Sequence, residues 1–180
     1  MSLLTLFAPA GPTPTLAPFD PAERSALAWV QPRAFAAQWR LIAGERTFAV
    51  LRGPGSLWKP VVLTTAAGAC ELRHTLWKGV TIAIPGGQPF ARVCAHVLGA
   101  GPVEVGGERK YTLRRVGFFA SDWELRTLDE MPLVHFTMRR ALLKLGADIA
   151  IEDAARRITQ LPQMLALTWF AMLNSRQRTA

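Results

Sequence analysis

Cysteine is scarce in this chain, which contains only Cys70 and Cys94. Two cysteines cannot build a disulfide framework, and they cannot form a structural zinc site without histidine ligands. Both stand in apolar segments of the sequence. We interpret them as small buried residues of a protein that resides in a reducing compartment.

Long hydrophobic runs are also missing, and we expect no secretion leader. The first basic residue is Arg24, so no positively charged segment precedes the apolar stretch 3–8. No run reaches the roughly 18–20 apolar residues that a membrane-spanning helix requires. We therefore expect a cytoplasmic protein without a transmembrane segment, which can still lie against a membrane surface.

Motifs for catalysis and metal binding are absent as well. The histidines at 74, 96 and 135 show no HxxxH or HxH spacing, and the sequence has no CxxC pair. It contains neither a G-x-S-x-G elbow nor a G-x-x-x-x-G-K-[ST] phosphate loop. We expect no catalytic residue, no metal and no cofactor, and predict that the protein is not an enzyme. An enzyme whose pocket the sequence does not reveal is the alternative.

One pair of carboxylates is a candidate for chemistry. Asp122 and Glu124 fall on the same face of a predicted strand, because strand side chains alternate. Such a pair can perform acid–base catalysis or bind a cation. Arginines at 114, 115 and 126 stand close by in the sequence. This mixture favours a solvated, charge-balanced outer face.

The composition is that of a globular domain with a basic surface. Half of the 180 residues are hydrophobic and 19% are charged, which provides for a sizeable core and argues against disorder. The net charge is +8. A basic excess suits an anionic partner, either nucleic acid or a membrane surface. It is also compatible with a general surface bias, because the arginines are scattered.

The N-terminal segment differs from the rest of the chain. Five of the thirteen prolines lie within residues 1–22, and proline prevents a continuous helix. We predict that residues 1–24 form a flexible, proline-rich arm. A single domain is expected to span residues 25–178.

The region from about 25 to 151 has the period-two pattern of strands. Val134, Phe136 and Met138 alternate with polar residues, for example. Pro85-Gly86-Gly87 and Gly106-Gly107 are typical of tight hairpin turns, because glycine tolerates positive φ. Many short strands with regular turns predict a barrel or a sandwich. For residues 138–146, where a helical stripe is the alternative, we predict two strands.

The last apolar segment predicts a helix over Pro162–Leu173. It contains two clearly polar side chains, Gln163 and Thr168, which lie about 140° apart on a helix, so no polar face exists. Twelve residues rise about 18 Å, too little to cross a bilayer. The sequence therefore predicts a mainly β fold, a closed antiparallel barrel of about twelve strands around this helix. A helix packed on one side of an open sheet is the alternative. The side chains expected to fill the barrel are Met164, Leu165, Leu167, Trp169, Phe170 and Leu173.

This layout resembles the tubby C-terminal-like superfamily, which includes the LURP-one-related proteins and the phospholipid scramblases. The matching pieces are the strand at 122–125, the turn at 129–130, residues 133–139 and 149–151, and the apolar run 161–170. The resemblance implies a closed barrel around a C-terminal helix. It also implies association with phospholipid, although no binding motif of the family matches closely enough to be transferred.

Two double-arginine sites are candidate anion or lipid contacts. They are Arg114-Arg115 and Arg139-Arg140, the second followed by Lys144. Neighbouring side chains in a strand point to opposite faces. Because an inward arginine is costly, we expect each strand to break or end at its arginine pair.

Tryptophans extend the list of candidates. Trp58 and Trp77 each precede a lysine near a strand end, so they are expected at the rim of the barrel. A tryptophan ring at that position can lie in a bilayer interface or stack on a nucleic-acid base. The favoured hypothesis is a non-catalytic binding or scaffold module at an anionic phospholipid surface. The alternatives are a nucleic-acid-binding barrel, which lacks support from an RNP-like string, and a protein–protein interaction module.

Overall fold

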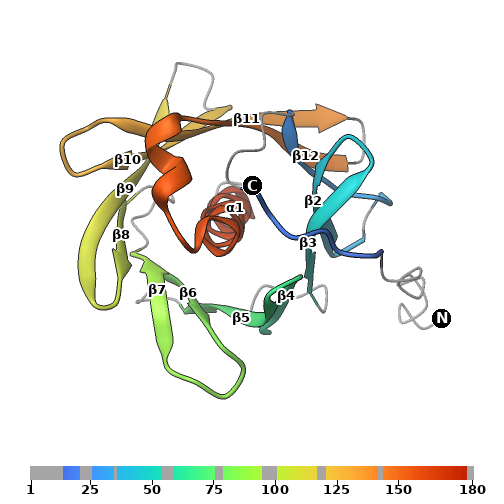
Figure 1. Cartoon of the computed structure of the whole chain (residues 1–180), viewed down its shortest axis with the longest axis horizontal. Coiled ribbons are helices and arrows are strands. Elements are labelled where there is room, and N and C mark those ends of the chain that lie inside the picture. Colours follow the sequence, from blue (N-terminus) through green and yellow to red (C-terminus); the bar gives the residue numbers. More distant parts are fainter. Residues whose placement is uncertain are drawn as a thin grey trace.

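A computed structural model of the chain shows a closed antiparallel β-barrel around one helix (Figure 1). It describes residues 14–20, 26–34, 36–53, 59–75, 79–94, 101–116, 121–141 and 144–177. Each strand pairs with its neighbours in sequence, and β1 pairs with β12 to close the barrel. The predicted fold class, a mainly β twelve-stranded barrel with a C-terminal helix, is confirmed.

The barrel strands are short, and most contain five to nine residues. They are β1 (Leu27–Val30), β2 (Gln38–Ala43), β3 (Arg46–Arg52), β4 (Val61–Thr65), β5 (Gly68–Thr75), β6 (Gly79–Ala83), β7 (Pro89–Val93), β8 (Gly101–Val105), β9 (Glu108–Val116), β10 (Asp122–Thr127), β11 (Pro132–Ala141) and β12 (Lys144–Ile151). The 3-10 helix η2 (Asp153–Arg157) then leads into α1 (Leu161–Gln177).

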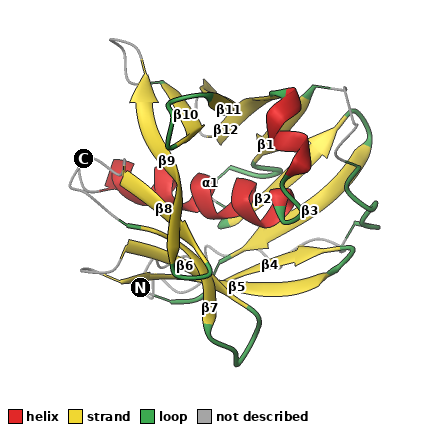
Figure 2. Cartoon of the chain, turned by 60° about the vertical axis from the view of Figure 1, so that its left-hand side comes forward, coloured by secondary structure: helices red, strands yellow, loops and turns green. Residues whose placement is uncertain are grey.

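Up-and-down order gives the barrel two distinct ends. The tight turns that follow β2, β4, β6, β8 and β10 lie at one end together with η2 and the start of α1, and we call it the turn end. The final residues of β1, β3, β5, β7, β9 and β11 lie at the opposite end with the last turn of α1. We call this the loop end. Figure 2 shows α1 lengthwise, with strands on both sides of it.

The seam between the first and last strands depends on a close backbone approach. Leu27 and Trp29 of β1 pair with Ile149 and Ala147 of β12. A Cβ atom at Gly146 would lie 2.6 Å from the carbonyl oxygen of Trp29, so only glycine fits there. Gly146 therefore belongs to the seam and does not cap a helix.

Residues 138–146 are confirmed as two strands. β11 and β12 pair in unbroken register from Val134 and Ile151 to Ala141 and Lys144. β11 therefore does not break at Arg139-Arg140. β9 also pairs regularly with β10 through Arg114 and Arg115. Each strand was expected to break or end at its arginine pair: the break is wrong, whereas each strand ends one residue beyond its pair.

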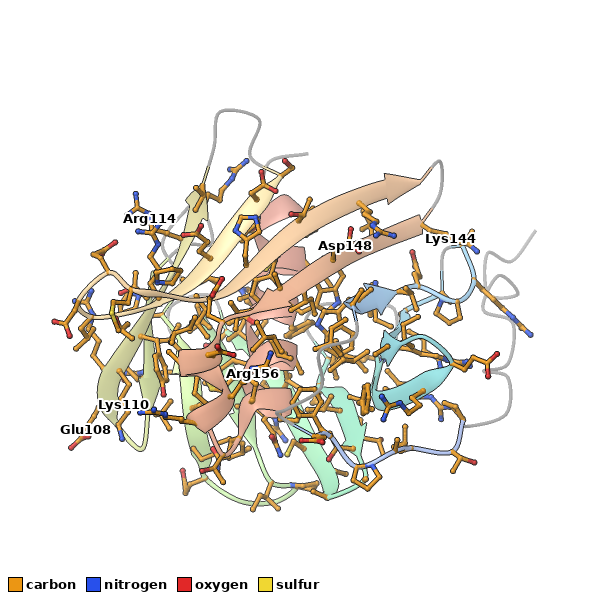
Figure 3. The ribbon with its side chains drawn as sticks, turned by 45° about the horizontal axis from the view of Figure 1, so that its top comes forward. Glu108, Lys110, Arg114, Lys144, Asp148 and Arg156 are labelled. Atoms are coloured by element: carbon orange, nitrogen blue, oxygen red, sulfur yellow. The ribbon has the colours of Figure 1, made fainter. Side chains whose placement is uncertain are left out.

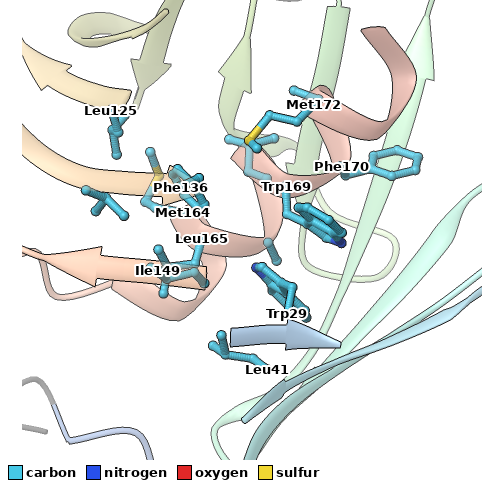
Figure 4. Close-up of a cluster of buried hydrophobic side chains, with 14 of the residues drawn as sticks. Trp29, Leu41, Leu125, Phe136, Ile149, Met164, Leu165, Trp169, Phe170 and Met172 are labelled. Atoms are coloured by element: carbon cyan, nitrogen blue, oxygen red, sulfur yellow. The ribbon is translucent and has the colours of Figure 1, made fainter. Parts of the chain in front are cut away.

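The helix α1 is enclosed almost completely. All six side chains expected to fill the barrel are at most 5% exposed. The indole ring of Trp169 stacks on that of Trp29 in β1, with ring centroids 6.2 Å apart (Figure 4). The helix extends four residues beyond the predicted end at Leu173. Asn174 and Ser175 stay buried because their side chains donate hydrogen bonds to the carbonyls of Phe170 and Met172.

Large side chains fill the barrel unevenly. The Cα atoms of α1 come within 8 Å of those in β3 to β7. Apart from Phe48 of β3, the buried side chains there are not aromatic, for example Ala91 and Val93. On the side of β1, β10 and β11, the interior holds Trp29, Trp123 and Phe136. Most of the large rings of the barrel wall thus lie on this second side.

Part of the N-terminal arm is described, and it contacts the barrel. Residues 14–20 run beside β3 at the turn end, where the amide of Ala17 donates to the carbonyl of Thr47. The ring of Phe19 meets that of Phe48 edge to face, with centroids 5.5 Å apart. This part of the arm is extended and has packing partners. The flexibility of the remainder stays a prediction.

Candidate functional site

Of the five basic residues predicted to contact anions, the four whose side chains the structure describes do not converge. Arg114 forms an ion pair with Glu130 at 3.0 Å, and Arg139 forms one with Asp148. Lys144 is exposed at the loop end of β12. Arg114 and Lys144 lie on opposite sides of the molecule in Figure 3. The side chain of Arg140 lies outside the described residues.

Arg115 has a structural role at the barrel rim. It pairs with Trp123 across the β9–β10 ladder, and its guanidinium lies over the Trp123 ring, 5.7 Å from the centroid. Trp123 is buried in the core, whereas Arg115 is exposed. The side chain therefore faces inward only where the barrel opens to solvent, which avoids the cost of a buried charge. It covers the edge of the core.

The densest polar group on the described surface lies on the outer wall of β10 and β11. Glu124 accepts a hydrogen bond from the Nε of Arg126 at 2.6 Å, and its other oxygen lies 3.2 Å from Nδ1 of His135. Nε2 of His135 lies 3.9 Å from Asp122. Glu130 bridges Arg114 and Arg126. The expected charge-balanced outer face is present here.

The chemistry of this wall is that of satisfied ion pairs. Burial acts to raise the pKa of Glu124, but hydrogen bonds from Arg126 and His135 outweigh it and hold the pKa below its ordinary value. A carboxylate held ionised in this way is a poor general acid. The described residues contain no group of three or more His, Cys, Asp or Glu that could hold a metal ion.

The two cysteines differ from each other. Cys70 is buried, and its burial raises the pKa of the thiol. Cys94 is only half-buried, which corrects the expectation for it, and its Sγ lies 3.4 Å from Glu104. Burial, followed by the hydrogen bond to Glu104, raises the pKa of the Cys94 thiol. Both remain protonated thiols at neutral pH, so neither is an activated nucleophile.

Charge is distributed unequally between the two ends of the barrel. We compare the terminal residues of the strands together with the described connections. At the turn end these positions hold many carboxylates: Glu45, Glu108, Asp129, Glu130, Glu152 and Asp153, against Arg46, Arg156 and Arg157. At the loop end they hold Arg33, Arg52, Lys59 and Lys144, and Asp122 is the single carboxylate.

Comparisons with known proteins return no match. The chain matches no family model, no curated protein and no solved structure. No helix in the described part of the chain is long and apolar enough to cross a membrane.

Sequence reasoning missed two of the loop-end cations. Some of the residues that it did name lie outside the described part of the chain. Arg33 and Lys59 were not singled out, although both are exposed and have no ion-pair partner among the described residues. The signal was available, since the sequences joining strands at this end contain no Asp or Glu. Trp58, Trp77 and His96 lie outside the described residues.

Proposed function

We propose that the protein is a non-catalytic binding module that docks its loop end on an anionic phospholipid surface. The observation that carries the proposal is the unequal charge of the two barrel ends. Arg33, Lys59 and Lys144 are exposed at one end without ion-pair partners among the described residues, while the carboxylates gather at the other. Such a polarity orients a protein toward a negative surface.

The filled interior restricts where a ligand can bind. Trp169, Leu165 and their neighbours occupy the barrel core and are fully buried. A lipocalin-like internal ligand site is therefore disfavoured, and a partner would use the wall or an end. On the described wall of β7 to β12, the arginines at 92, 114, 126 and 139 each pair with a carboxylate. These four arginines therefore leave little uncompensated positive charge on this part of the described wall.

The composition of the sequences that join the strands at the loop end also supports this end as the docking surface. Four of the sequences that join strands there contain two adjacent large apolar residues, namely Leu57-Trp58, Leu76-Trp77, Phe118-Phe119 and Leu142-Leu143. Three of these pairs are followed directly by lysine. These residues lie outside the described part of the chain. As a composition, apolar and basic residues without carboxylates suit an anionic bilayer interface.

Kinship with the tubby C-terminal-like superfamily is part of the proposal. Its support is the architecture: twelve antiparallel strands in closed order and an enclosed helix in last position. The kinship would agree with a phospholipid partner, but the charge polarity supports that partner without it.

The test is sedimentation with vesicles of phosphatidylcholine that contain increasing fractions of phosphatidylserine. Binding should rise with the phosphatidylserine fraction and fall with added salt. The double variant Lys59→Glu/Lys144→Glu should lower the partition coefficient at least about tenfold, since each basic residue near such a surface contributes about 1 kcal/mol. The control, Arg109→Glu/Arg157→Glu at the turn end, changes the net charge equally and should bind like the unaltered protein.

Three results would contradict the proposal. Equal losses in both double variants would show that net charge alone, without a docking face, drives binding. Binding that a single-stranded oligonucleotide abolishes, with affinity for the oligonucleotide greater than for vesicles, would favour the nucleic-acid alternative. Binding to neither ligand at moderate salt would leave a protein partner as the function to be pursued.

A further inference from the structure

The start of β3 has a free backbone edge at the turn end of the barrel. β4 pairs with β3 over residues 49–52, and the chain turns into β5 directly after Thr65. Among the described barrel strands, none therefore pairs with residues 46–48 on that side. An edge of this kind is a template on which an extended segment can add as a further strand.

Residues 14–20, which we call the docked segment, occupy this edge (blue in Figure 1). Leu16 forms a parallel bridge with Thr47, and the amide of Ala17 donates to the Thr47 carbonyl at 2.8 Å. The neighbours of β3 within the barrel, β2 and β4, are both antiparallel to it. The docked segment is therefore an addition to the sheet, outside the up-and-down order of the barrel.

An aromatic side chain anchors the docked segment. Ala17 and Phe19 are partly buried against the barrel core, and Pro18 between them is exposed. This alternation is that of an added strand. The Phe19 ring meets the Phe48 ring edge to face, with centroids 5.5 Å apart. Phe48 therefore provides an aromatic contact directly beside the free edge.

Few backbone contacts hold the docked segment. Between its described residues and the barrel there is one backbone hydrogen bond, the one that Ala17 donates. Successive amides of a strand point to opposite sides, so positions 14 and 18 turn away from β3. Both are proline, which has no amide donor. The segment thus covers the free edge and offers no donor at these positions for a further strand.

A segment held by one backbone hydrogen bond and one ring contact can exchange with a competing strand. We propose that the free edge of β3 is a docking site for an extended peptide segment of another protein, and that the docked segment is its intramolecular competitor. The geometry fits a ligand whose amide donates to the Thr47 carbonyl and whose aromatic side chain, two residues later, packs on Phe48. The site lies at the turn end, opposite the proposed membrane face, and does not rest on the proposed function.

The first experiment titrates the full chain with a synthetic peptide that has the sequence of residues 13–21, and follows the amide NMR signals of residues 46–48. The competitor is tethered, with an effective concentration of about 1 mM, and it raises the apparent dissociation constant of the peptide. Phe19→Ala in the protein removes the anchor of the competitor. This constant should therefore fall about fivefold to tenfold. Thr15→Ala, which alters an exposed side chain of the same segment, should leave it unchanged.

Two altered peptides test the contacts of the ligand. One carries Phe19→Ala, and the other has a methyl group on the Ala17 nitrogen, which can then no longer donate. Both should bind the Phe19→Ala protein about fivefold more weakly than the parent peptide. The proposal is overturned if either altered peptide binds as well as the parent. It is also overturned if the parent peptide binds the two proteins equally, or binds neither at about 1 mM.

Sedimentation equilibrium tests a different occupant. The unaltered protein should be a monomer. A dimer that Phe19→Ala dissociates would assign the edge to the arm of a second copy and would overturn the proposal. Vesicle binding should be the same for the unaltered protein and Phe19→Ala, so a failure here leaves the test of Lys59 and Lys144 intact.

Discussion

Trp29 and Trp169 stack with their ring planes 8° from parallel, although one belongs to the first barrel strand and the other to the final helix. Both rings are completely buried. Trp29 also lies at the seam, where its carbonyl oxygen faces Gly146 of β12. Trp29 therefore takes part both in the β1–β12 seam that closes the barrel and in the packing of α1 inside it.

Removing the helix partner of this pair should destabilise the whole barrel. Trp169→Ala deletes a ring in a close-packed core, and we expect the free energy of unfolding to fall by about 3–5 kcal/mol. Urea unfolding followed by circular dichroism measures the change. The control is Met131→Ala in the β10–β11 turn, where the side chain is 55% exposed, and its effect should stay within about 0.5 kcal/mol. Similar midpoints for the two variants would show that the enclosed helix contributes little.

Gly146 offers a test of the seam itself. In Gly146→Ala the new methyl group would meet the Trp29 carbonyl at 2.6 Å, so the strands must separate. We expect a loss of about 1–3 kcal/mol. In Gly87→Ala the added Cβ meets the Ile84 carbonyl at 3.2 Å in an exposed turn, and the loss should be clearly smaller. The order of the two urea midpoints decides the matter, and the reverse order would contradict a tight seam.

The fold was predictable because its two signals are strong and compatible. Alternation over Val134–Met138 defines a wall with one apolar face, and α1 lacks any polar face. Thr168 does not create a polar face on α1, because its hydroxyl donates to the carbonyls of Met164 and Leu165 within the helix. The sequence of β1 does not by itself predict a strand, because Leu27–Val30 is apolar on both faces and shows no alternation. The helix end was misplaced because Asn174 looks like a polar terminus but bonds to its own helix.

Acid should weaken the outer wall through Glu124. Its pKa lies below the ordinary 4.5 in the folded protein, so it contributes stability that is fully present above pH 4.5 and is lost as the pH falls through the folded-state value. The free-energy difference between the unaltered protein and Glu124→Gln should therefore be constant from pH 7 to about 5 and shrink at lower pH. Urea unfolding at several pH values measures it.

A matched control separates this effect from general acid sensitivity. Glu108 is exposed, and its carboxylate lies 3.7 Å from Lys110. Glu108→Gln should change stability little at any pH, because exposed ion pairs contribute at most about 1 kcal/mol. A difference for Glu124→Gln that grows as the pH falls would contradict the assigned hydrogen bonds.

Gln31 connects segments at the loop end that are far apart in sequence. Its Nε2 donates to the carbonyl of Ala36 at 2.6 Å, and its Oε1 accepts from the amide of Leu145 at 2.9 Å. Gln31→Leu removes both bonds and leaves two backbone groups without partners. We expect a loss of about 1–3 kcal/mol by urea unfolding. Gln88→Leu in the exposed β6–β7 turn is the control, and an equal loss there would assign the effect to exposed leucine.

The candidate sites were less predictable than the fold. Adjacent arginines suggested anion contacts, but the sequence does not state which carboxylate each arginine meets. Glu130 reaches both Arg114 and Arg126 from a turn in which it adopts a φ of 62°.

The position of α1 after all twelve strands has a consequence for biosynthesis. The strands leave the ribosome first, and the apolar side chains on their inner face have no helix to pack against until residues 161–177 are made. A nascent sheet in that condition exposes apolar surface and unpaired edges, which promote aggregation. Synthesis of the chain up to residue 161 is therefore the period in which it depends most on a holding chaperone, and a ribosome that stalls before that residue would release a barrel without its central helix.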